Sequence, residues 1–216
     1  MIGPRSRVLR ELVTAGVLAY VTRWQPVLAG WLLSTAALTW KADDVHDPAG
    51  MATLLRIIVV LVVTSVVYLV DDAAANVLAP VPLPLAWRYG VRFGLAAAAV
   101  ALPWVAALLW VNPGHLAAGL TLECVAMTTF ALAVASGIAR WSDTHDAGAA
   151  AGPAVLGTAV LAEFLPPRWA MFAPPGDGWR DAHLRWTAVL GLALAVLLLT
   201  LRDPARRYSV PGPRHG

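Results

Sequence analysis

The sequence predicts an all-α membrane protein, a transmembrane bundle of six helices that form a single domain over residues 1–216. Six stretches of the chain are apolar and close in length to the roughly 20 helical residues that cross a bilayer core of about 30 Å. Hydrophobic residues make up 59% of the chain and charged residues only 13%, below the roughly 25% of a soluble domain. Residues 57–70 lack the polar–apolar alternation of a barrel strand, which favours helices.

The six spans differ in strength. The fifth has weak hydropathy and contains Pro153 and Glu163, but its many small residues allow close packing between helices. Residues 8–22, between Arg10 and Arg23, precede the first span. We favour a separate interfacial helix for them, with the lower part of a long first span as the alternative. The expected spans are residues 22–40, 51–70, 91–111, 115–139, 148–165 and 185–201.

The distribution of basic residues predicts the orientation, because short loops rich in Lys and Arg stay in the cytoplasm. With the N-terminus inside and six crossings, ten basic residues lie in inner segments and four in outer segments. We therefore expect a multi-pass protein of the inner (plasma) membrane with both termini in the cytoplasm. The inner residues are Arg5, Arg7, Arg10, Arg88, Arg92, Arg140, Arg202, Arg206, Arg207 and Arg214, and the outer residues are Lys41, Arg168, Arg180 and Arg185.

The loop after the second span combines two acidic residues with a proline-rich segment. Asp72 is a suitable N-cap for a short helix over residues 73–79. Three prolines then hold the chain extended, and a Trp-Arg pair anchors the next span at the membrane interface. The pattern fits either a docking surface or an ordinary interfacial loop. The candidate docking residues are Asp71, Asp72, Asn76, Pro80, Pro82, Pro84, Trp87 and Arg88.

This loop, LVDDAAANVLAPVPLPLAWRYGVR, and the order of elements around it resemble the small ABC transporter permeases of the drug-export type from high-GC bacteria. The resemblance covers nearly the whole chain in layout, and at residue level it is confined to the loop. It implies six helices with both termini inside, an interfacial helix before the first span, and a re-entrant hairpin between the fifth and sixth spans. It also implies that the loop contacts a separate ATPase subunit.

The outer loop over residues 166–184 is rich in aromatic residues, among them Trp169, Phe172 and Trp179. Aromatic side chains favour the membrane interface, so we expect this segment to dip into the outer leaflet. A re-entrant hairpin and an interfacial aromatic belt without a gating role are both consistent with it.

Three charged residues, Arg56, Glu123 and Glu163, fall within the expected spans. All three lie within about 12 Å of the outer boundary at 1.5 Å per helical residue. An unpaired charge at the centre of a bilayer costs about 2.5–3.5 kcal/mol, so pairing is expected. We predict that Arg56 pairs with Glu123, either as a polar lining of a substrate path or as a structural bridge.

The sequence excludes some chemistry. Lys41 is the only lysine and lies between Trp40 and Ala42, so the chain lacks the Gly-Lys-Ser/Thr of a phosphate-binding loop. Cys124 is the only cysteine, which leaves no internal disulfide.

Two clusters of acidic residues with histidine, residues 43–47 and 143–146, are predicted to fall on opposite sides of the membrane. Each is expected to be a solvated loop rather than a metal site.

The first hypothesis is a permease subunit of an ABC exporter, which moves an unidentified amphipathic small molecule or peptide by alternating access. It would not be an enzyme: ATP and Mg²⁺ would bind to a partner ATPase, and this chain would bind no cofactor, metal or nucleic acid. A second copy or a sister permease would complete it within the lipid bilayer. The alternatives are a metal-dependent enzyme acting on lipid phosphates through Asp71, Asp72, Asp143 and Asp146, and a non-catalytic accessory or immunity protein.

Overall fold

The computed structural model describes residues 24–41, 47–71, 85–142 and 146–201. Within these ranges it contains six α-helices and no strand, which confirms the all-helical prediction for this part of the chain. The α-helices are α2 (Gln25–Trp40), α3 (Pro48–Val66), α5 (Leu85–Val111), α6 (Ala117–Trp141), α7 (Ala147–Glu163) and α8 (Trp179–Thr200). Three short 3-10 helices adjoin them, namely η2 (Val67–Val70) after α3, η3 (Gly114–Leu116) before α6 and η4 (Pro167–Trp169) between α7 and α8.

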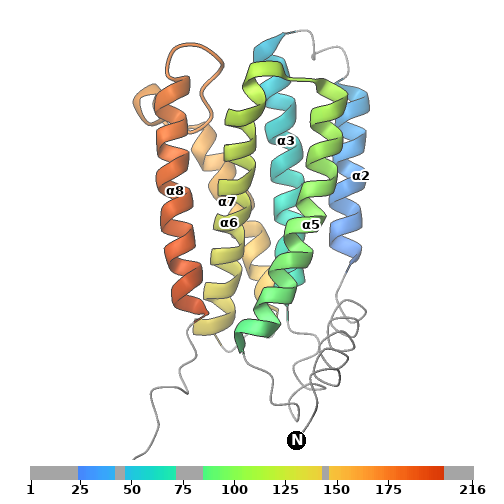
Figure 1. The fold of residues 1–216 in the computed structure, drawn as a ribbon, viewed down its shortest axis with the longest axis vertical. Helices are drawn as coiled ribbons and strands as arrows, with labels where there is room; N and C mark the ends of the chain where they lie inside the picture. Colours follow the sequence, from blue (N-terminus) through green and yellow to red (C-terminus); the bar gives the residue numbers. More distant parts are fainter. Residues whose placement is uncertain (1–23, 42–46, 72–84, 143–145, 202–216) are drawn as a thin grey trace, which may run out of the picture.

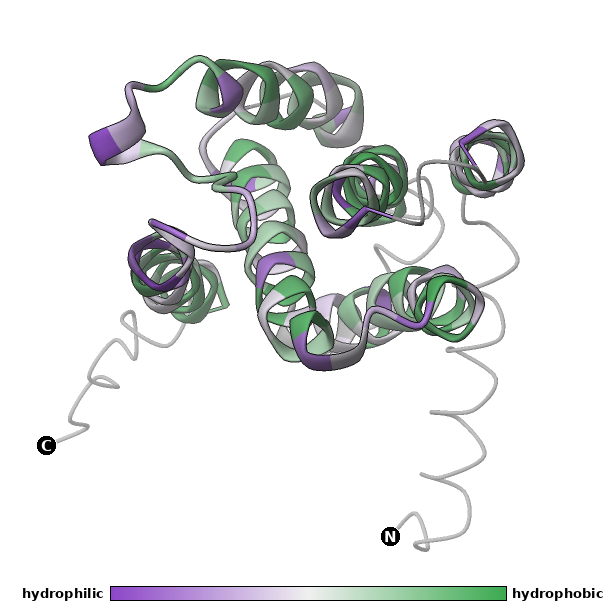
Figure 2. Ribbon diagram, turned by 90° about the horizontal axis from the view of Figure 1, so that it is seen from above, coloured by the Kyte–Doolittle hydropathy of each residue, from purple (hydrophilic) through white to green (hydrophobic). Residues whose placement is uncertain are grey.

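Consecutive helices of the bundle run in opposite directions (Figure 1). The central helix is α6, which packs against α8, α7 and α3, while α2 packs mainly against α3. Seen from above, α2 and α8 lie on opposite sides of the bundle (Figure 2). In the orientation of Figure 1, the upper end carries the loop between α7 and α8, and the lower end is where α2 begins and α8 ends.

Four helical segments are long and apolar enough to cross a membrane: Pro48–Val70, Tyr89–Val111, Gly114–Trp141 and Trp179–Thr200. The predicted fifth span corresponds to α7, which has 17 residues and would be about 26 Å long at 1.5 Å per residue. The described part of the first span, α2, has 16 residues. Four of the six predicted spans thus have the expected length and hydropathy, and the first and fifth remain predictions.

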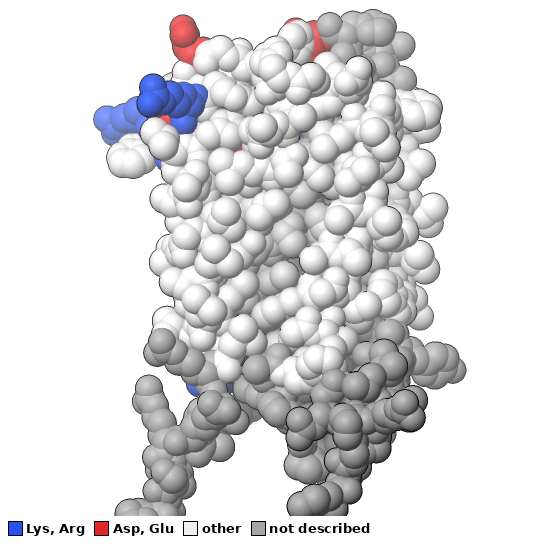
Figure 3. Space-filling model, in the orientation of Figure 1, with Lys and Arg blue, Asp and Glu red and all other residues white. Residues whose placement is uncertain are grey.

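The outside of the bundle is apolar. On the face seen in Figure 3, the charged side chains of the described residues lie near the ends, and the band between them is uncharged. Large hydrophobic side chains are exposed on all six α-helices, as at Leu32, Leu102, Leu161 and Leu192. An apolar belt between charged ends is the surface expected of a protein that contacts lipid.

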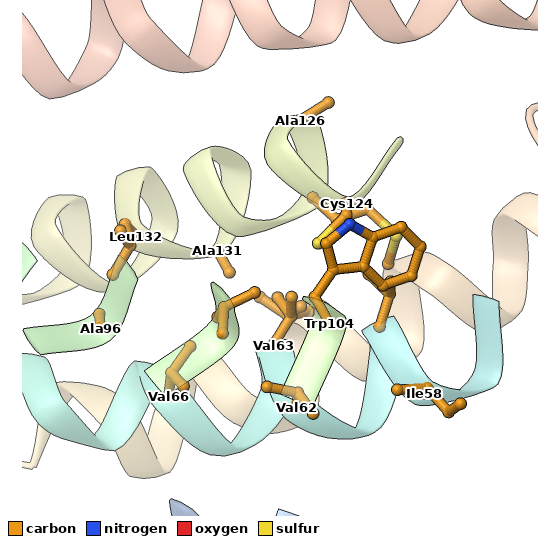
Figure 4. Packing of buried hydrophobic residues seen from close by; sticks show 14 of the residues in the cluster. Ile58, Val62, Val63, Val66, Ala96, Trp104, Cys124, Ala126, Ala131 and Leu132 are labelled. Atoms are coloured by element: carbon orange, nitrogen blue, oxygen red, sulfur yellow. The ribbon is translucent and has the colours of Figure 1, made fainter. Parts of the chain in front are cut away.

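Close approach of small residues holds the interior together. Ile58, Val62 and Val66 of α3 belong to the same buried cluster as alanines of α5 and α6, among them Ala96 and Ala131 (Figure 4). Lipid tails are as apolar as these side chains, so helices in a membrane associate through van der Waals contact, which small residues increase.

Two glycines show how tight these contacts are. A Cβ built on Gly30 of α2 would lie 2.4 Å from Ser65 Oγ and 3.0 Å from the Leu61 carbonyl oxygen. A Cβ on Gly148 of α7 would lie 2.7 Å from the Cα of Tyr68 and 2.9 Å from the Val67 carbonyl oxygen. Backbone atoms cannot move aside as a flexible side chain can, so α7 reaches η2 only because residue 148 has no side chain.

The start of α8 corrects the predicted outer loop. The helix begins at Trp179, six residues before the predicted span, so the loop between α7 and α8 ends at Gly178. Gly178 has a positive φ of 83°, and Asp181 lies in the first turn of the helix, where a carboxylate is favourable. Arg180, Asp181 and His183 lowered the hydropathy of a segment that is nevertheless helical.

Two predicted elements lie outside the described residues. These are the interfacial helix over residues 8–22 and the short helix over residues 73–79. Most of the proline-rich docking loop also lies outside the described residues, because residues 72–84 are not described.

Substitution of Gly148 should destabilise the bundle. We expect Gly148→Ala to lower the free energy of unfolding by about 1–3 kcal/mol, because the new methyl group overlaps the backbone of η2. Gly157→Ala on the same helix is the matched control, since a Cβ there meets nothing within 4 Å. Chemical unfolding of both purified variants in detergent measures the difference, and equal stabilities would contradict the close contact.

Candidate functional site

A buried ion pair joins α3 to α6 near the upper end of the bundle. Arg56 donates from Nε to Glu123 Oε2 at 2.8 Å and from Nη2 to Glu123 Oε1 at 2.7 Å. Only 11% of the Arg56 side chain and 2% of the Glu123 side chain are exposed. Two parallel bonds are the strong form of an arginine–carboxylate contact, and buried charges are tolerated only when paired. The structure therefore contains the pair that the sequence predicted.

A histidine on α8 completes a charge cluster, defined here as Arg56, Glu123 and His183. His183 Nδ1 lies 2.7 Å from the Trp179 carbonyl oxygen, which can only accept, so Nδ1 carries a proton. Nε2 of the same ring is buried without a hydrogen-bond partner and lies 3.5 Å from Glu123 Oε1.

Aromatic rings cover the guanidinium of this cluster. The guanidinium carbon of Arg56 lies 5.4 Å from the centre of the Phe172 ring and 5.6 Å from that of Trp179. The Trp179 ring in turn lies 4.3 Å from the His183 ring. The contacts of the Arg56 guanidinium with the two aromatic rings are attractive, and the attraction is stronger where water is excluded.

The carbonyl groups of the loop between α7 and α8 bind both Arg56 of the cluster and side chains of α8. Arg56 Nη2 donates to the Ala173 carbonyl at 2.9 Å, and Trp186 Nε1 donates to the Met171 carbonyl at 2.8 Å. Arg185 donates to the carbonyls of Ala170 at 2.6 Å and Arg168 at 2.7 Å. Irregular backbone near lipid needs such donors, because an unpaired buried carbonyl is costly.

The other residues that the sequence predicted for this region lie in different environments. Phe172 and Trp179 contact the charge cluster, whereas Trp169 is exposed in η4. Trp179 belongs to α8 and not to the loop in which it was predicted. Glu163 is exposed at the end of α7, and no ion pair or hydrogen bond of its carboxylate is present among the described residues.

His183 is the member of the charge cluster that the sequence pattern did not indicate. Its predicted place in the outer loop puts it outside the spans in which charged residues are expected to pair. The usable signal was its spacing from Trp179, one helical turn, after a glycine suited to precede a helix.

A groove beside the cluster separates α3 from α7. Its volume is about 440 Å³, and Arg56 and Glu163 both line it. A second cavity of about 330 Å³, with an apolar lining, lies between α6, α7 and α8. Ala159 and Phe172 line both spaces, so cavities flank the upper half of α7 on two sides.

At the lower end, Asp71 connects the end of η2 to the start of α7. Its side chain is buried, and Oδ1 accepts a hydrogen bond from the backbone N–H of Gly148 at 2.5 Å. A carboxylate at a helix N-terminus is also favoured by the helix dipole. Nearby, Arg92 donates to the Val70 carbonyl at 3.0 Å. The Asp71 carboxylate thus has a structural role, because it links the end of η2 to the start of α7.

The remaining docking candidates are not tested by the described residues. Trp87 is half-buried on α5, and the side chain of Arg88 lies outside the description. The same holds for Asp72, Asn76, Pro80, Pro82 and Pro84, and for most of the two histidine-containing acidic clusters. Within the described ranges no group of three or more His, Cys, Asp and Glu is arranged to hold a metal ion.

No protein-family model, curated protein or solved structure matches this chain. The family expected from the loop resemblance therefore remains a hypothesis.

Removing one member of the ion pair should be costly. We expect Glu123→Gln to lower the free energy of unfolding by about 3 kcal/mol, because it leaves the buried Arg56 guanidinium without its counter-charge. The double variant Arg56→Met with Glu123→Met should recover most of this loss, since an apolar pair leaves no buried charge. Chemical unfolding in detergent compares the two, and a double variant as unstable as Glu123→Gln would contradict this account.

Proposed function

We propose that this chain is the membrane-spanning permease subunit of an ABC exporter, which moves an amphipathic small molecule or peptide by alternating access. A separate ATPase subunit would bind ATP and Mg²⁺ and supply the energy. A second copy of the chain, or a sister permease, would complete the path. The loop resemblance motivates the proposal, and the geometry at the root of that loop supports it.

The supporting observation is that the loop starts from a point fixed to two helices. Asp71, the last described residue before it, continues η2 and accepts the hydrogen bond from Gly148 at the start of α7. A force applied to residues 72–84 would therefore reach α3 and α7 together. This is the connection that a docked ATPase would need in order to move helices.

The helix α3 extends from this point to the charge cluster. Arg56 and Asp71 are fifteen positions apart along α3 and η2, which corresponds to about 22 Å of helix. The helix α7 is closely packed against Tyr68 at its lower end and flanked by cavities at its upper end. A tilt of either helix would change the spaces next to Arg56, where an amphipathic substrate would find both apolar walls and a few polar groups.

The proposal includes a topology in the membrane. It has six crossings, with α2 and α7 as the two shorter ones, and both termini in the cytoplasm of a cell whose plasma membrane holds the protein. The antiparallel order of the helices in Figure 1 is consistent with it. The upper end then faces outward, and the loop between α7 and α8 lies at the outer leaflet as a re-entrant segment or an aromatic belt.

The geometry favours this proposal over the lipid-phosphate enzyme. That alternative needs the Asp71 carboxylate as a metal ligand, yet the carboxylate is buried and accepts a backbone hydrogen bond. A ligand of an open catalytic metal site would have to face the solvent or the substrate.

The decisive experiment is affinity purification of the tagged chain from its native membranes in mild detergent. We expect an ATPase subunit to be recovered with it. Replacing Pro80, Pro82 and Pro84 by alanine should reduce that recovery severalfold, because the stiff docking segment is lost. Trp169→Ala, at the opposite end of the bundle, is the matched control. Recovery of the chain without any ATPase would overturn the proposal.

The topology can be tested by cysteine labelling. In a Cys124→Ala background, a membrane-impermeant thiol reagent should label Asp177→Cys on intact cells and should leave Asn76→Cys unlabelled until the cells are opened. Asp177 is exposed in the upper loop, and residue 76 belongs to the proposed cytoplasmic loop. Labelling of Asn76→Cys on intact cells would place the docking loop outside, where no ATPase could reach it.

A further inference from the structure

The groove between α3 and α7 has a polar upper part and an apolar lower part. Its polar groups belong to Thr53 and Arg56 on α3 and to Glu163 at the end of α7, while Val60 and Leu61 lie further along α3. The residues that line it are Ala49, Thr53, Arg56, Ile57, Val60, Leu61, Ala159, Val160, Glu163, Phe172 and Pro174.

Its extent along α3 matches one leaflet of a bilayer. The lining residues from Ala49 to Leu61 recur every three or four positions, so they form one stripe on the helix. Twelve residues of helix correspond to about 18 Å, and half of a bilayer core is about 15 Å. The groove therefore runs from the upper interface to near the centre of the membrane.

Arg56 offers this groove two N–H groups that the ion pair does not use. A guanidinium has five N–H donors. Nε and Nη2 supply the three bonds to Glu123 and to the Ala173 carbonyl. Nη1 makes no hydrogen bond among the described residues and is not among the buried atoms without a partner. Nη1 is therefore at least partly accessible, and Arg56 is one of the residues that line the groove.

Glu163 supplies an opposite charge on the α7 side of the groove. It lines the groove, is exposed, and has no ion pair or hydrogen bond within the described part of the chain. Since Glu123 already balances the charge of Arg56, a purely anionic ligand would be repelled by Glu163 without a compensating net attraction. A purely cationic ligand would leave the Arg56 donors unused. A zwitterionic ligand would accept hydrogen bonds from Arg56 with its anionic group and pair with Glu163 through its cationic group.

We propose that this groove binds a zwitterionic phospholipid with a primary amine, taken from the adjoining leaflet. The phosphate accepts hydrogen bonds from Arg56 Nη1, and the ammonium group pairs with Glu163. One acyl chain lies along Ile57, Val60 and Leu61. The bilayer supplies this ligand at high concentration next to the groove. The site requires no ATPase and no transport activity, so it does not rest on the proposed function.

Native mass spectrometry of the full chain, released from detergent with added lipids, tests the site. We expect phosphatidylethanolamine to bind at least tenfold more tightly than phosphatidylglycerol, which has no amine to pair with Glu163. Glu163→Gln should weaken phosphatidylethanolamine binding about tenfold, the loss of one charge-assisted contact. Val160→Trp should abolish the preference, because Val160 is half exposed on the groove wall and the indole would fill it.

Two matched variants control for general effects. Asp177→Asn removes an exposed acid at the same end of the bundle, and Leu109→Trp adds the same ring to an exposed position of α5. Neither residue lines the groove, so both variants should bind phosphatidylethanolamine as the parent chain does. Water-soluble glycerophosphoethanolamine should not compete, because it has no chain to fill the apolar part.

Four results would overturn the proposal. The first is equal binding of phosphatidylethanolamine and phosphatidylglycerol by the parent chain. The second is unchanged binding by Glu163→Gln or Val160→Trp. The third is competition by glycerophosphoethanolamine at the same concentration as the lipid, which would identify a soluble ligand instead. A lipid-free dimer that Val160→Trp dissociates would also overturn it, because a second copy would then fill the groove.

Discussion

Charged and titratable side chains in an apolar bundle constrain one another far more than they would in water. Removal of water makes an unpaired charge very costly, so Arg56 has to reach both oxygens of Glu123 and the Ala173 carbonyl at the same time. His183 from α8 meets the same carboxylate. Because α3, α6 and α8 each contribute one member, the cluster fixes their relative depth and holds the upper loop against them. Most other contacts of the bundle are apolar and carry no such directional requirement.

The helix α7 is packed unevenly along its length. At its lower end Gly148 and Gly152 lie against Tyr68, and the backbone of Gly148 also binds Asp71. At its upper end cavities lie on either side, and Phe172 separates them. Small residues that allow close contact with η2 also leave little side-chain volume to fill the upper spaces. The same composition therefore produces a fixed end and a loosely packed end.

The two proposals share Arg56 but depend on different parts of the chain. The transport proposal depends on the loop root at Asp71 and on a partner subunit. The lipid proposal depends on Arg56 Nη1 and Glu163, and on the bilayer alone. A phospholipid in the groove would lie next to Phe172 and the Ala173 carbonyl. If both proposals hold, the lipid would occupy a wall of the path through which an amphipathic substrate moves.

The amino-acid sequence by itself determined that the chain is helical and apolar outside, because length and hydropathy are local properties. It also determined that Arg56 and Glu123 should pair, since their depths in two long spans agree and neither charge is tolerable alone. The sequence did not indicate that His183 lies beside Glu123 or that α8 begins at Trp179. Polar residues near that end of the helix lower its hydropathy, although the segment is helical. Only the tertiary structure decided that Asp71 points into the bundle, that Glu163 stays outside the ion pair, and that a groove separates α3 from α7. These features depend on how helices far apart in the sequence approach one another, and no local pattern of residues specifies that distance.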